Sequence, residues 1–535
     1  MTSTFNSKFV ANWHRTWSGG SWSDGSWLWV PVAALSSALL SAISALFPKF
    51  YALGWIAFVP VLLGLQHCRT AKQAYGFGLL TGFLTFGLST YWMAEFIRLF
   101  RDYSFIHSVT LSSLYWFYCA QMFAIIAVVT HYARRGNAVL WVFPTVTTLV
   151  FAFYPTLFPW QLGNSQREFL VALQATDITG VSGLDFMLCL VNVLIAQALI
   201  GRQEFFQRSA LAAYALVMVW FLYGVFSLAY WDRDIANSET MKIGLVQADE
   251  PPTIGTPDPR PSFSLSYPIE MELTEQLVAA GAELVIWPEV RNKQYYSEPF
   301  VQAAYQRQVS NLASPLLFQS PEQEGSGDGL RNYNSATLID ENGKHLGQYR
   351  KIKRIAMAEY LPLFEHSEIV KKWARQLLGE FFGNYSAGPE AKSFTLGRAS
   401  IKPFICFEII SPQFVATSIN AAGGDILTVQ SNNGWFGDTR VPYQHMSASV
   451  LRSVENRKPL VHVMNNGLGG VVLPTGRMIL QTERSEIAGY LIDVPFTAAS
   501  ENNGVTTFYS RYPYWLVTVL GLGLILMLMR AWRHF

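Results

Sequence analysis

The sequence predicts a polytopic α-helical membrane bundle of about eight spans joined to an α/β domain on the extracytoplasmic side. Charged residues make up 14% of the 535 residues, against about 25% in ordinary soluble proteins. Aromatic residues reach 15%, and the mean hydropathy is +0.21. The pattern predicts a membrane domain of seven helices over residues 1–232, a domain of ordinary polarity over 241–508 and a last membrane helix over 513–535.

Eight apolar runs are candidates for membrane spans, because a hydrocarbon core about 30 Å thick needs roughly 17–25 apolar residues per helix. They cover residues 27–47, 53–66, 75–96, 111–132, 138–154, 184–200, 211–231 and 515–529. The second run is short and fits a tilted or half-inserted segment. The first run follows a long polar leader without a persuasive cleavage site, which predicts an anchor rather than a signal peptide.

Lys and Arg residues gather on one set of loops, and this bias predicts the orientation in the membrane. One side carries Lys8, Arg15, Arg69, Lys72, Arg134, Arg135, Arg202, Arg208, Arg530 and Arg533. The other short loops carry Lys49, Arg98, Arg101 and Arg167. Since the side richer in Lys and Arg is cytoplasmic, both termini are expected inside and the polar domain outside.

The remaining composition disfavours several functional classes. A net charge of +2 without a basic block argues against nucleic-acid binding. Three of the four cysteines lie in apolar segments and only Cys406 lies in the polar domain, so no disulfide framework is expected. No cluster of Cys and His has metal-ligand spacing, and we expect no metal and no cofactor. Apart from Glu95 near a helix end, the apolar runs offer few charges to support transport.

Short apolar runs alternate with helical patterns in the polar domain, which predicts an α/β fold. Strands are expected at residues 242–247, 283–287, 316–319, 336–339, 401–407, 425–430, 460–464, 470–473 and 489–494, and helices at 269–280, 412–422 and 443–456. Asn342-Gly343 and Pro474-Thr475-Gly476 predict hairpin turns. Residues 251–264 and 320–328 are expected to form flexible loops. Residues 361–392 predict a helix that either packs on the domain or dips into the membrane interface as a lid.

Three strand ends in this domain carry side chains that together suit covalent catalysis. Cys406 ends one apolar strand, Glu289 ends another, and Lys351 follows a third. A thiol with a pKa of about 8.5 needs a base to react at neutral pH, and a lysine ammonium favours both a thiolate and an oxyanion. From the residues alone, an inert core thiol and a solvated ion pair remain alternatives.

The ordered motifs Trp287-Pro288-Glu289, Tyr349-x-Lys351 and Cys406-Phe407-Glu408 resemble the Glu-Lys-Cys pattern of the nitrilase (carbon–nitrogen hydrolase) superfamily. Eight spans around such a domain, with Phe158-Pro159-Trp160 in a long loop, resemble its membrane-bound branch, the bacterial apolipoprotein N-acyltransferases. Further matches are Glu-Tyr-Leu-Pro-Leu at 359–363, Ser-Asn-x-x-Trp-Phe-Gly at 431–437 and Asn-Asn-Gly at 465–467. The resemblance covers nearly the whole chain.

This resemblance implies an αββα sandwich over residues 241–508, with Cys406 as nucleophile, Glu289 as general base and Lys351 as oxyanion stabiliser. It further implies supporting roles for Glu359, Glu408 and Phe407, and a substrate-binding role for Trp435, Asn432 and Asn465. Ile-Ala-Met-Ala at 355–358 departs from the Val-Pro-Phe-Gly run of the family. Lys353 lies nearby, but the spacing to Glu359 selects Lys351. A Cys–His dyad would point to His445, yet the glutamate fills the base role and His445 is expected to be structural or substrate-lining.

The implied reaction is the final step of lipoprotein maturation. A phospholipid would give its acyl chain to Cys406 as a thioester, and the α-amine of a diacylated apolipoprotein would accept it in a ping-pong cycle. The implied enzyme is a monomer without cofactor or nucleic-acid partner. It would cross the bacterial inner membrane several times, with the catalytic domain on the periplasmic side. The alternatives are a membrane-tethered amidase or nitrilase with water as acceptor, and a transport or scaffold protein with an inactive site.

Overall fold

The computed structural model describes residues 26–101, 103–133, 138–200, 208–251, 258–289, 294–326, 330–362, 367, 369–372, 376, 385–497 and 506–533. The chain divides into two compact units. The first comprises Met1–Glu95, Ser104–Val225 and Tyr514–Phe535, and the second comprises Phe96–Tyr103 and Phe226–Pro513. The domain boundaries expected at residues 232, 241 and 513 remain predictions, because units defined by internal contacts need not follow the edge of a membrane.

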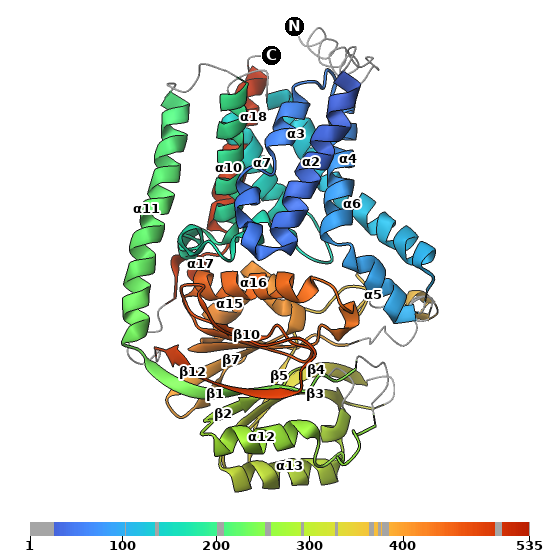
Figure 1. Cartoon of the computed structure of the whole chain (residues 1–535), viewed down its shortest axis with the longest axis vertical. Coiled ribbons are helices and arrows are strands. Elements are labelled where there is room, and N and C mark those ends of the chain that lie inside the picture. Colours follow the sequence, from blue (N-terminus) through green and yellow to red (C-terminus); the bar gives the residue numbers. More distant parts are fainter. Residues whose placement is uncertain are drawn as a thin grey trace. The chain divides into compact units, whose positions relative to one another are not determined.

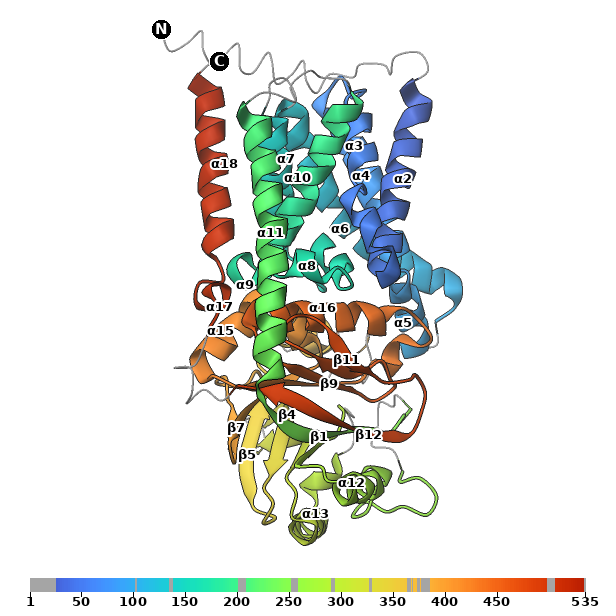
Figure 2. The ribbon, with the colours of Figure 1, turned by 60° about the vertical axis from the view of Figure 1, so that its left-hand side comes forward.

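The first unit is built from helices. They are α2 (Ser26–Leu46), η1 (Pro48–Trp55), α3 (Val59–Leu65), α4 (Ala71–Ser89), α5 (Trp92–Arg101), α6 (Phe105–Ala133), α7 (Val139–Phe153), η2 (Leu162–Gln166), α8 (Leu170–Leu173), α9 (Thr176–Thr179), α10 (Val181–Leu199), α11 (Arg208–Ala236) and α18 (Trp515–Arg533). Within this unit, α2, α7, α10 and α18 have roughly aligned axes (Figure 2). Helices α5 and α11 continue into the second unit.

Several of these helices are long and apolar enough to cross a membrane. Among the described residues, five segments meet this test: Trp29–Leu46, Pro48–Leu65, Phe105–Ala133, Val181–Leu199 and Arg208–Ala236. Val139–Phe153 and Trp515–Met527 are shorter apolar helices. These segments confirm the polytopic helical character. The run expected at 75–96 is different, since α4 ends at Ser89 and a separate helix begins at Trp92.

Buried polar side chains explain the interruptions of the apolar helices. Asn192 of α10 accepts the backbone N–H groups of Phe58 and Val59 at 2.7 and 3.1 Å and donates to the Gly54 carbonyl at 3.1 Å. It therefore satisfies backbone groups freed by the break between η1 and α3, which apolar surroundings would leave unpaired. Asp185 of the same helix accepts the Gly163 N–H at 2.7 Å. Asp185 is a charge within an expected span that the sequence analysis did not weigh.

The second unit is an α/β sandwich of two six-stranded sheets. The first sheet has the order β12-β1-β2-β3-β4-β5 and the second the order β11-β10-β9-β8-β7-β6. The strands are β1 (Glu239–Gln247), β2 (Leu284–Ile286), β3 (Leu316–Glu324), β4 (Arg331–Ile339), β5 (His345–Arg350), β6 (Phe394–Leu396), β7 (Ala399–Ile405), β8 (Ile426–Ser431), β9 (Leu460–Met464), β10 (Gly470–Val472), β11 (Met478–Gln481) and β12 (Ala488–Phe496).

Helices cover the two outer faces of this sandwich. In Figure 1, α12 (Ile269–Ala279) and α13 (Pro299–Leu312) lie on one side of the sheets, and α15 (Pro412–Ala422) and α16 (Val441–Asn456) lie on the other. The short α17 (Phe508–Arg511) follows β12. Leu245 of β1 packs with Ile401 and Val461 of the second sheet, whereas the next residue, Val246, packs with the α12 side. This alternation is the period of two that strands impose, and the expected αββα architecture is confirmed.

The first and last strands of the sandwich pair with each other. β1 and β12 are antiparallel over their full lengths, from Glu239 opposite Phe496 to Gln247 opposite Ala488. On its other edge, β1 pairs in parallel with β2. The expected hairpin turns are also present, because Gly343 and Gly476 adopt φ angles of +79° and +86°, which only glycine adopts freely.

The nine strands expected by range in the polar domain and the helices expected at 269–280, 412–422 and 443–456 are present, and the strand expected before Lys351 is β5. The structure adds β6, β11, α13 and α17, which were not expected as elements. The loop expected at 320–328 is wrong in its first half, since β3 continues to Glu324. Pro321 is tolerated there because β2 pairs with β3 only up to Leu317, so its missing N–H faces no strand. Most of the helix expected within 361–392 lies outside the described residues.

Candidate active site

Cys406 lies where β7 turns into a short 3₁₀ helix. The side chain is 5% exposed and belongs to the core between the two sheets. Its backbone has a φ of +53°, a left-handed conformation that costs a residue with a Cβ on the order of 1–3 kcal/mol. The turn ends β7 at Cys406. The buried thiol therefore faces side chains that come from the opposite sheet.

Glu289 follows β2 and is held from several directions. The preceding Trp287 donates its indole N–H to Thr274 Oγ1 of α12 at 2.8 Å. Its carbonyl accepts the side-chain amide of Gln430 at 2.8 Å. Glu289 Oε1 accepts the Asn334 side-chain amide at 2.9 Å. The buried carboxylate is therefore fixed in position rather than free in a loop.

Lys351 follows β5 and is almost completely buried, with 1% of its side chain exposed. Its Nζ donates to Glu359 Oε1 at 3.0 Å. Glu359 Oε2 in turn accepts the Ile355 N–H at 2.8 Å. Burial alone would lower the pKa of Lys351, but the carboxylates of Glu359 and Glu289, with Glu408, outweigh it and raise the pKa. Lys351 therefore remains a cation.

Lys353 has a different environment two residues further on. Partial desolvation lowers its pKa, and Glu408 is the charge that opposes this effect. Lys351, in contrast, interacts with both Glu289 and Cys406. The buried ion pair of Lys351 with Glu359 at 3.0 Å and the exposed position of Lys353 favour the choice of Lys351, whose role remains a prediction.

Glu408 joins the strand end that carries Cys406 to the one that carries Lys351. Its carboxylate is fully buried and accepts the N–H groups of Ile352, Lys353 and Ile405 at 2.8–2.9 Å. The Tyr349 hydroxyl donates to the same carboxylate at 2.9 Å. Burial raises the pKa of Glu408, while the Ile405 N–H and the Lys351 charge act in the opposite direction. The carboxylate thus ties the end of β5 in the first sheet to the end of β7 in the second, beside the thiol.

The electrostatics around Cys406 keep its thiol protonated. Burial first, and then the charge of Glu289, raise the pKa of Cys406 well above its ordinary value, and the opposing Lys351 cation does not cancel them. The Glu289 carboxylate is the main charge that raises the pKa of the thiol, which places it next to Cys406. A protonated thiol against a carboxylate is the arrangement of a nucleophile with a general base. It differs from a preformed thiolate stabilised by a neighbouring cation.

His445 contacts the backbone of Cys406 rather than its thiol. Its Nε2 lies 3.2 Å from the Cys406 carbonyl oxygen, so Nε2 carries the proton that is donated. Burial lowers the pKa of His445 to about 4, so the ring is neutral near pH 7. The ring stacks on Phe407 with centroids 4.7 Å apart. His445 therefore supports the turn at Cys406 and is not placed to deprotonate the thiol.

A second neutral histidine lies behind the first. His462 is fully buried between the hydroxyls of Ser431 and Ser449, each 2.8 Å from a ring nitrogen. Its ring meets that of His445 edge to face at 4.7 Å. Burial lowers the pKa of His462 well below its ordinary value. Among the described residues, no group of three or more His, Cys, Asp or Glu side chains is arranged to hold a metal ion.

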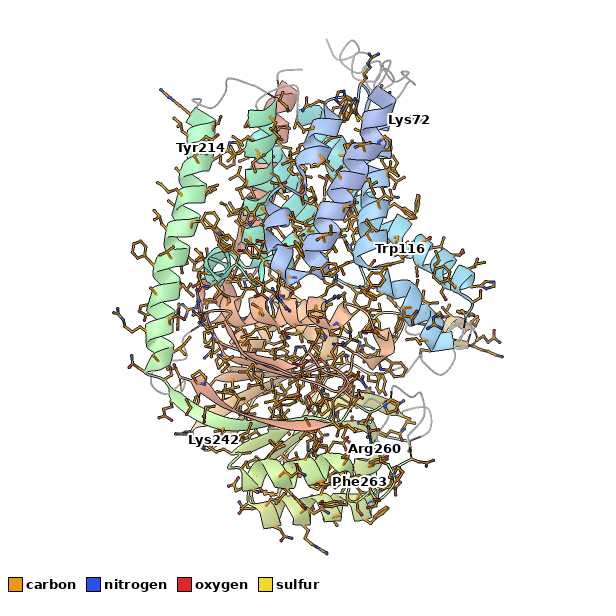
Figure 3. The ribbon with its side chains drawn as sticks, in the orientation of Figure 1. Lys72, Trp116, Tyr214, Lys242, Arg260 and Phe263 are labelled. Atoms are coloured by element: carbon orange, nitrogen blue, oxygen red, sulfur yellow. The ribbon has the colours of Figure 1, made fainter. Side chains whose placement is uncertain are left out.

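The residues expected to bind substrate differ in their burial and in their hydrogen-bond partners. Asn432 Oδ1 accepts the Gly434 N–H at 3.0 Å, and Trp435 is half-buried. The Asn465 amide both donates to and accepts from the backbone of Glu250, at 2.8 and 2.9 Å. Arg260, labelled in Figure 3, binds the same segment through the Glu250 carboxylate at 3.0 Å. Asn465 thus positions a loop, and substrate contacts by these residues remain predictions.

Asn334 and Gln319 are neighbours of the site that the sequence analysis missed. Asn334 lies at even spacing from Ala336 and Leu338 of β4, which face the core between the sheets. The period of two therefore predicts an inward-facing amide at residue 334. The sequence thus carries a signal for this residue.

Two family models match this chain, one in its helical part and one in its α/β part. Residues 36–194 match the family described as "Apolipoprotein N-acyltransferase N-terminal domain", and residues 259–492 match "Carbon-nitrogen hydrolase". The apolipoprotein N-acyltransferase of Geobacter metallireducens is 30% identical over 461 residues, which cover 83% of this chain and 85% of the relative. That of Chlorobaculum tepidum is 27% identical over 546 residues, which cover 93% and 96%. Among solved structures, a mutant of the Nesterenkonia amidase from the nitrilase superfamily aligns with 48% of this chain and 92% of its own, with a TM-score of 0.36 and 17% identity.

Proposed function

The chain belongs to the apolipoprotein N-acyltransferase family, and from this premise we propose that it moves an acyl chain from a phospholipid to the N-terminal α-amine of a diacylated lipoprotein through a thioester on Cys406. The observation that carries the proposal is the convergence of three buried side chains from separate strand ends, Cys406, Glu289 and Lys351, with Glu289 held by Asn334 and Lys351 by Glu359. We assign the roles of nucleophile, general base and oxyanion stabiliser to these three residues.

The first half-reaction forms the acyl-enzyme. Glu289 takes the thiol proton as Cys406 Sγ attacks the ester carbonyl of the phospholipid. The Lys351 ammonium stabilises the oxyanion of the tetrahedral intermediate. When the ester C–O bond breaks, the lysophospholipid leaves with the proton that Glu289 had taken. The products are a thioester and an unprotonated Glu289.

The second half-reaction transfers the acyl chain to the lipoprotein. The neutral α-amine attacks the thioester carbonyl, and Glu289 takes a proton from the attacking nitrogen. The C–S bond then breaks, and Glu289 returns that proton to the Cys406 sulfur. An amide forms and the starting thiol is restored. Because the donor leaves before the acceptor reacts, two lipidic substrates can use one site in turn.

The proposed setting is a monomer in the bacterial inner membrane with the catalytic unit on the periplasmic side. The apolar helices support a multi-pass membrane protein, and the Lys and Arg bias of the loops supports this orientation. The membrane would present both the phospholipid and the lipoprotein to the enzyme.

Mass spectrometry of the intact, purified chain tests the proposal. Incubation with phospholipid alone should add one acyl chain, which hydroxylamine removes and which Cys406→Ala lacks. Cys68→Ala is the matched control, since Cys68 is also buried but lies in the first unit. Adding a diacylated lipopeptide with a free amine should discharge the thioester. Release of free fatty acid without lipopeptide would instead support the hydrolase alternative.

A further inference from the structure

We propose that Asn334 is a positioning residue that aligns the general base with the oxyanion-stabilising lysine. The inference rests on the proposed roles of Glu289 and Lys351. Asn334 lies on β4, the strand between β3 and β5 in the first sheet. It is 2% exposed, so its amide is satisfied by protein groups.

Asn334 contacts both catalytic segments, one with its side chain and one with its backbone. Its Nδ2 donates to Glu289 Oε1 at 2.9 Å. Its carbonyl oxygen accepts the Lys351 N–H at 2.8 Å. A single residue therefore sets where the carboxylate lies and where the chain that carries the lysine leaves the sheet.

The orientation of the Asn334 amide is fixed by its second neighbour. Gln319 Nε2 donates to Asn334 Oδ1 at 2.9 Å, and Gln319 itself is 7% exposed. Because Oδ1 is occupied by a donor, Nδ2 must face Glu289. If the amide were turned over, an oxygen would face the carboxylate and two donors would face each other.

This orientation has a chemical consequence for Glu289. Oε1 is engaged by the amide, so Oε2 is the oxygen that is left to take the thiol proton. A hydrogen bond to the ionised form of a carboxyl group favours that form, and a buried carboxylate without donors binds a proton more readily. Asn334 therefore keeps Glu289 able to act as a base as well as holding it in place.

The pH dependence of Cys406 acylation distinguishes this role from simple packing. The full-length enzyme is mixed with phospholipid, and the acylation rate is measured by intact mass between pH 5 and 9. In Asn334→Ala, Glu289 loses its donor, and the acid limb of the profile should move to higher pH. Asn334→Asp should move it further, because two carboxyl groups would share a proton. Asn332→Ala, on the same strand and half-buried, is the control and should keep the wild-type limb.

Each outcome of this experiment decides the inference. A fall in rate of equal size at every pH, with the limb unmoved, would make Asn334 structural and overturn the proposal. If neither Asn334 variant folds, Gln319→Leu tests the proposal, since it leaves Asn334 in place but releases its amide. A smaller shift of the acid limb in the same direction supports the proposal. An unmoved acid limb overturns it. If the wild-type enzyme forms no thioester, the proposed function fails first, and the two failures remain distinguishable.

Discussion

The two sheets of the catalytic unit meet at the same site with different chemistry. The first sheet brings charged groups, Glu289 after β2 and Lys351 after β5. The second sheet brings the thiol of Cys406, supported by the histidines 445 and 462, whose pKa values burial lowers. The proposed nucleophile thus lies beside neutral histidines, while the groups proposed to activate it come from the opposite sheet. Apart from Cys406 itself, we expect substitutions in the first sheet to slow the reaction and substitutions of the buried groups of the second sheet to weaken the fold.

The largest effect is expected on the rate of thioester formation, from Lys351→Ala in the first sheet. Loss of one preorganised donor to an oxyanion lowers the rate by about 10²–10³-fold. The rate of thioester formation from phospholipid measures the loss. Lys353→Ala is the matched control, because Lys353 is an exposed lysine two residues further on and is not among the charges that shift the pKa of Cys406. Equal losses in the two variants would contradict the assignment and the contrast between the sheets.

An effect of intermediate size is expected on the stability of the protein in acid, from the neutral His445 beside the second sheet. The pKa of His445 is about 4 in the folded protein and about 6.5 in an unfolded chain. Between these values the unfolded state binds more protons, so the free energy of unfolding rises with pH and is lost as pH falls from 6.5 towards 4. The loss amounts to about 3 kcal/mol.

Thermal unfolding of the detergent-solubilised protein at pH 4–7 measures this dependence. His445→Gln removes the titrating group while keeping an amide donor for the Cys406 carbonyl. The variant should have a weaker pH dependence than the wild type, with His462 contributing what remains. An unchanged dependence would show that His445 is not a source of the acid sensitivity.

The smallest effect is expected on stability at pH 7, from Lys402→Met on β7. The Lys402 side chain is fully buried and donates to the Lys392 carbonyl at 3.0 Å. Burial lowers its pKa to about 8, with Glu408 opposing the shift. Between this value and the unfolded pKa of about 10.4, the unfolded state binds more protons, so stability due to Lys402 rises with pH. Replacement of a buried charge by an apolar side chain is often neutral or stabilising.

Chemical denaturation between pH 7 and 10.5 tests the Lys402 prediction. Lys402→Met should lack the rise in stability above pH 8 and should differ from the wild type by about 1 kcal/mol or less at pH 7. A large loss of stability at pH 7 would show that the second sheet depends on this charge, which would break the contrast between the two sheets.

The fold was predictable because it follows strong local patterns, and the same patterns marked the candidate site residues. Apolar runs marked the helices of the first unit, and strands such as 460–464 and the helix 412–422 were expected at their observed bounds. The Glu-Lys-Cys motifs stood at strand ends, where an α/β sheet places its site. The family and the fold were both confirmed.

The features that escaped prediction depend on tertiary contacts. β6 has three residues, too few to show a period, and forms because β7 pairs with it. β3 runs through Pro321 only because no neighbouring strand needs that N–H. The role of Asn465 in holding Glu250 joins residues more than two hundred positions apart, and the amide of Asn334 on β4 reaches Glu289 after β2, with β3 between them. Local patterns carry no information about such pairings.

The pairing of the first strand with the last has a consequence for biosynthesis. Glu239 lies opposite Phe496, so nearly all of the catalytic unit leaves the ribosome before β1 can acquire its second neighbour. At about 5–20 residues per second, the open edge of β1 waits on the order of tens of seconds. During that interval the nascent chain presents an unpaired strand edge, which is prone to aggregation. The catalytic unit can therefore complete its fold only near the end of translation, and any shortened version of the protein must keep β12.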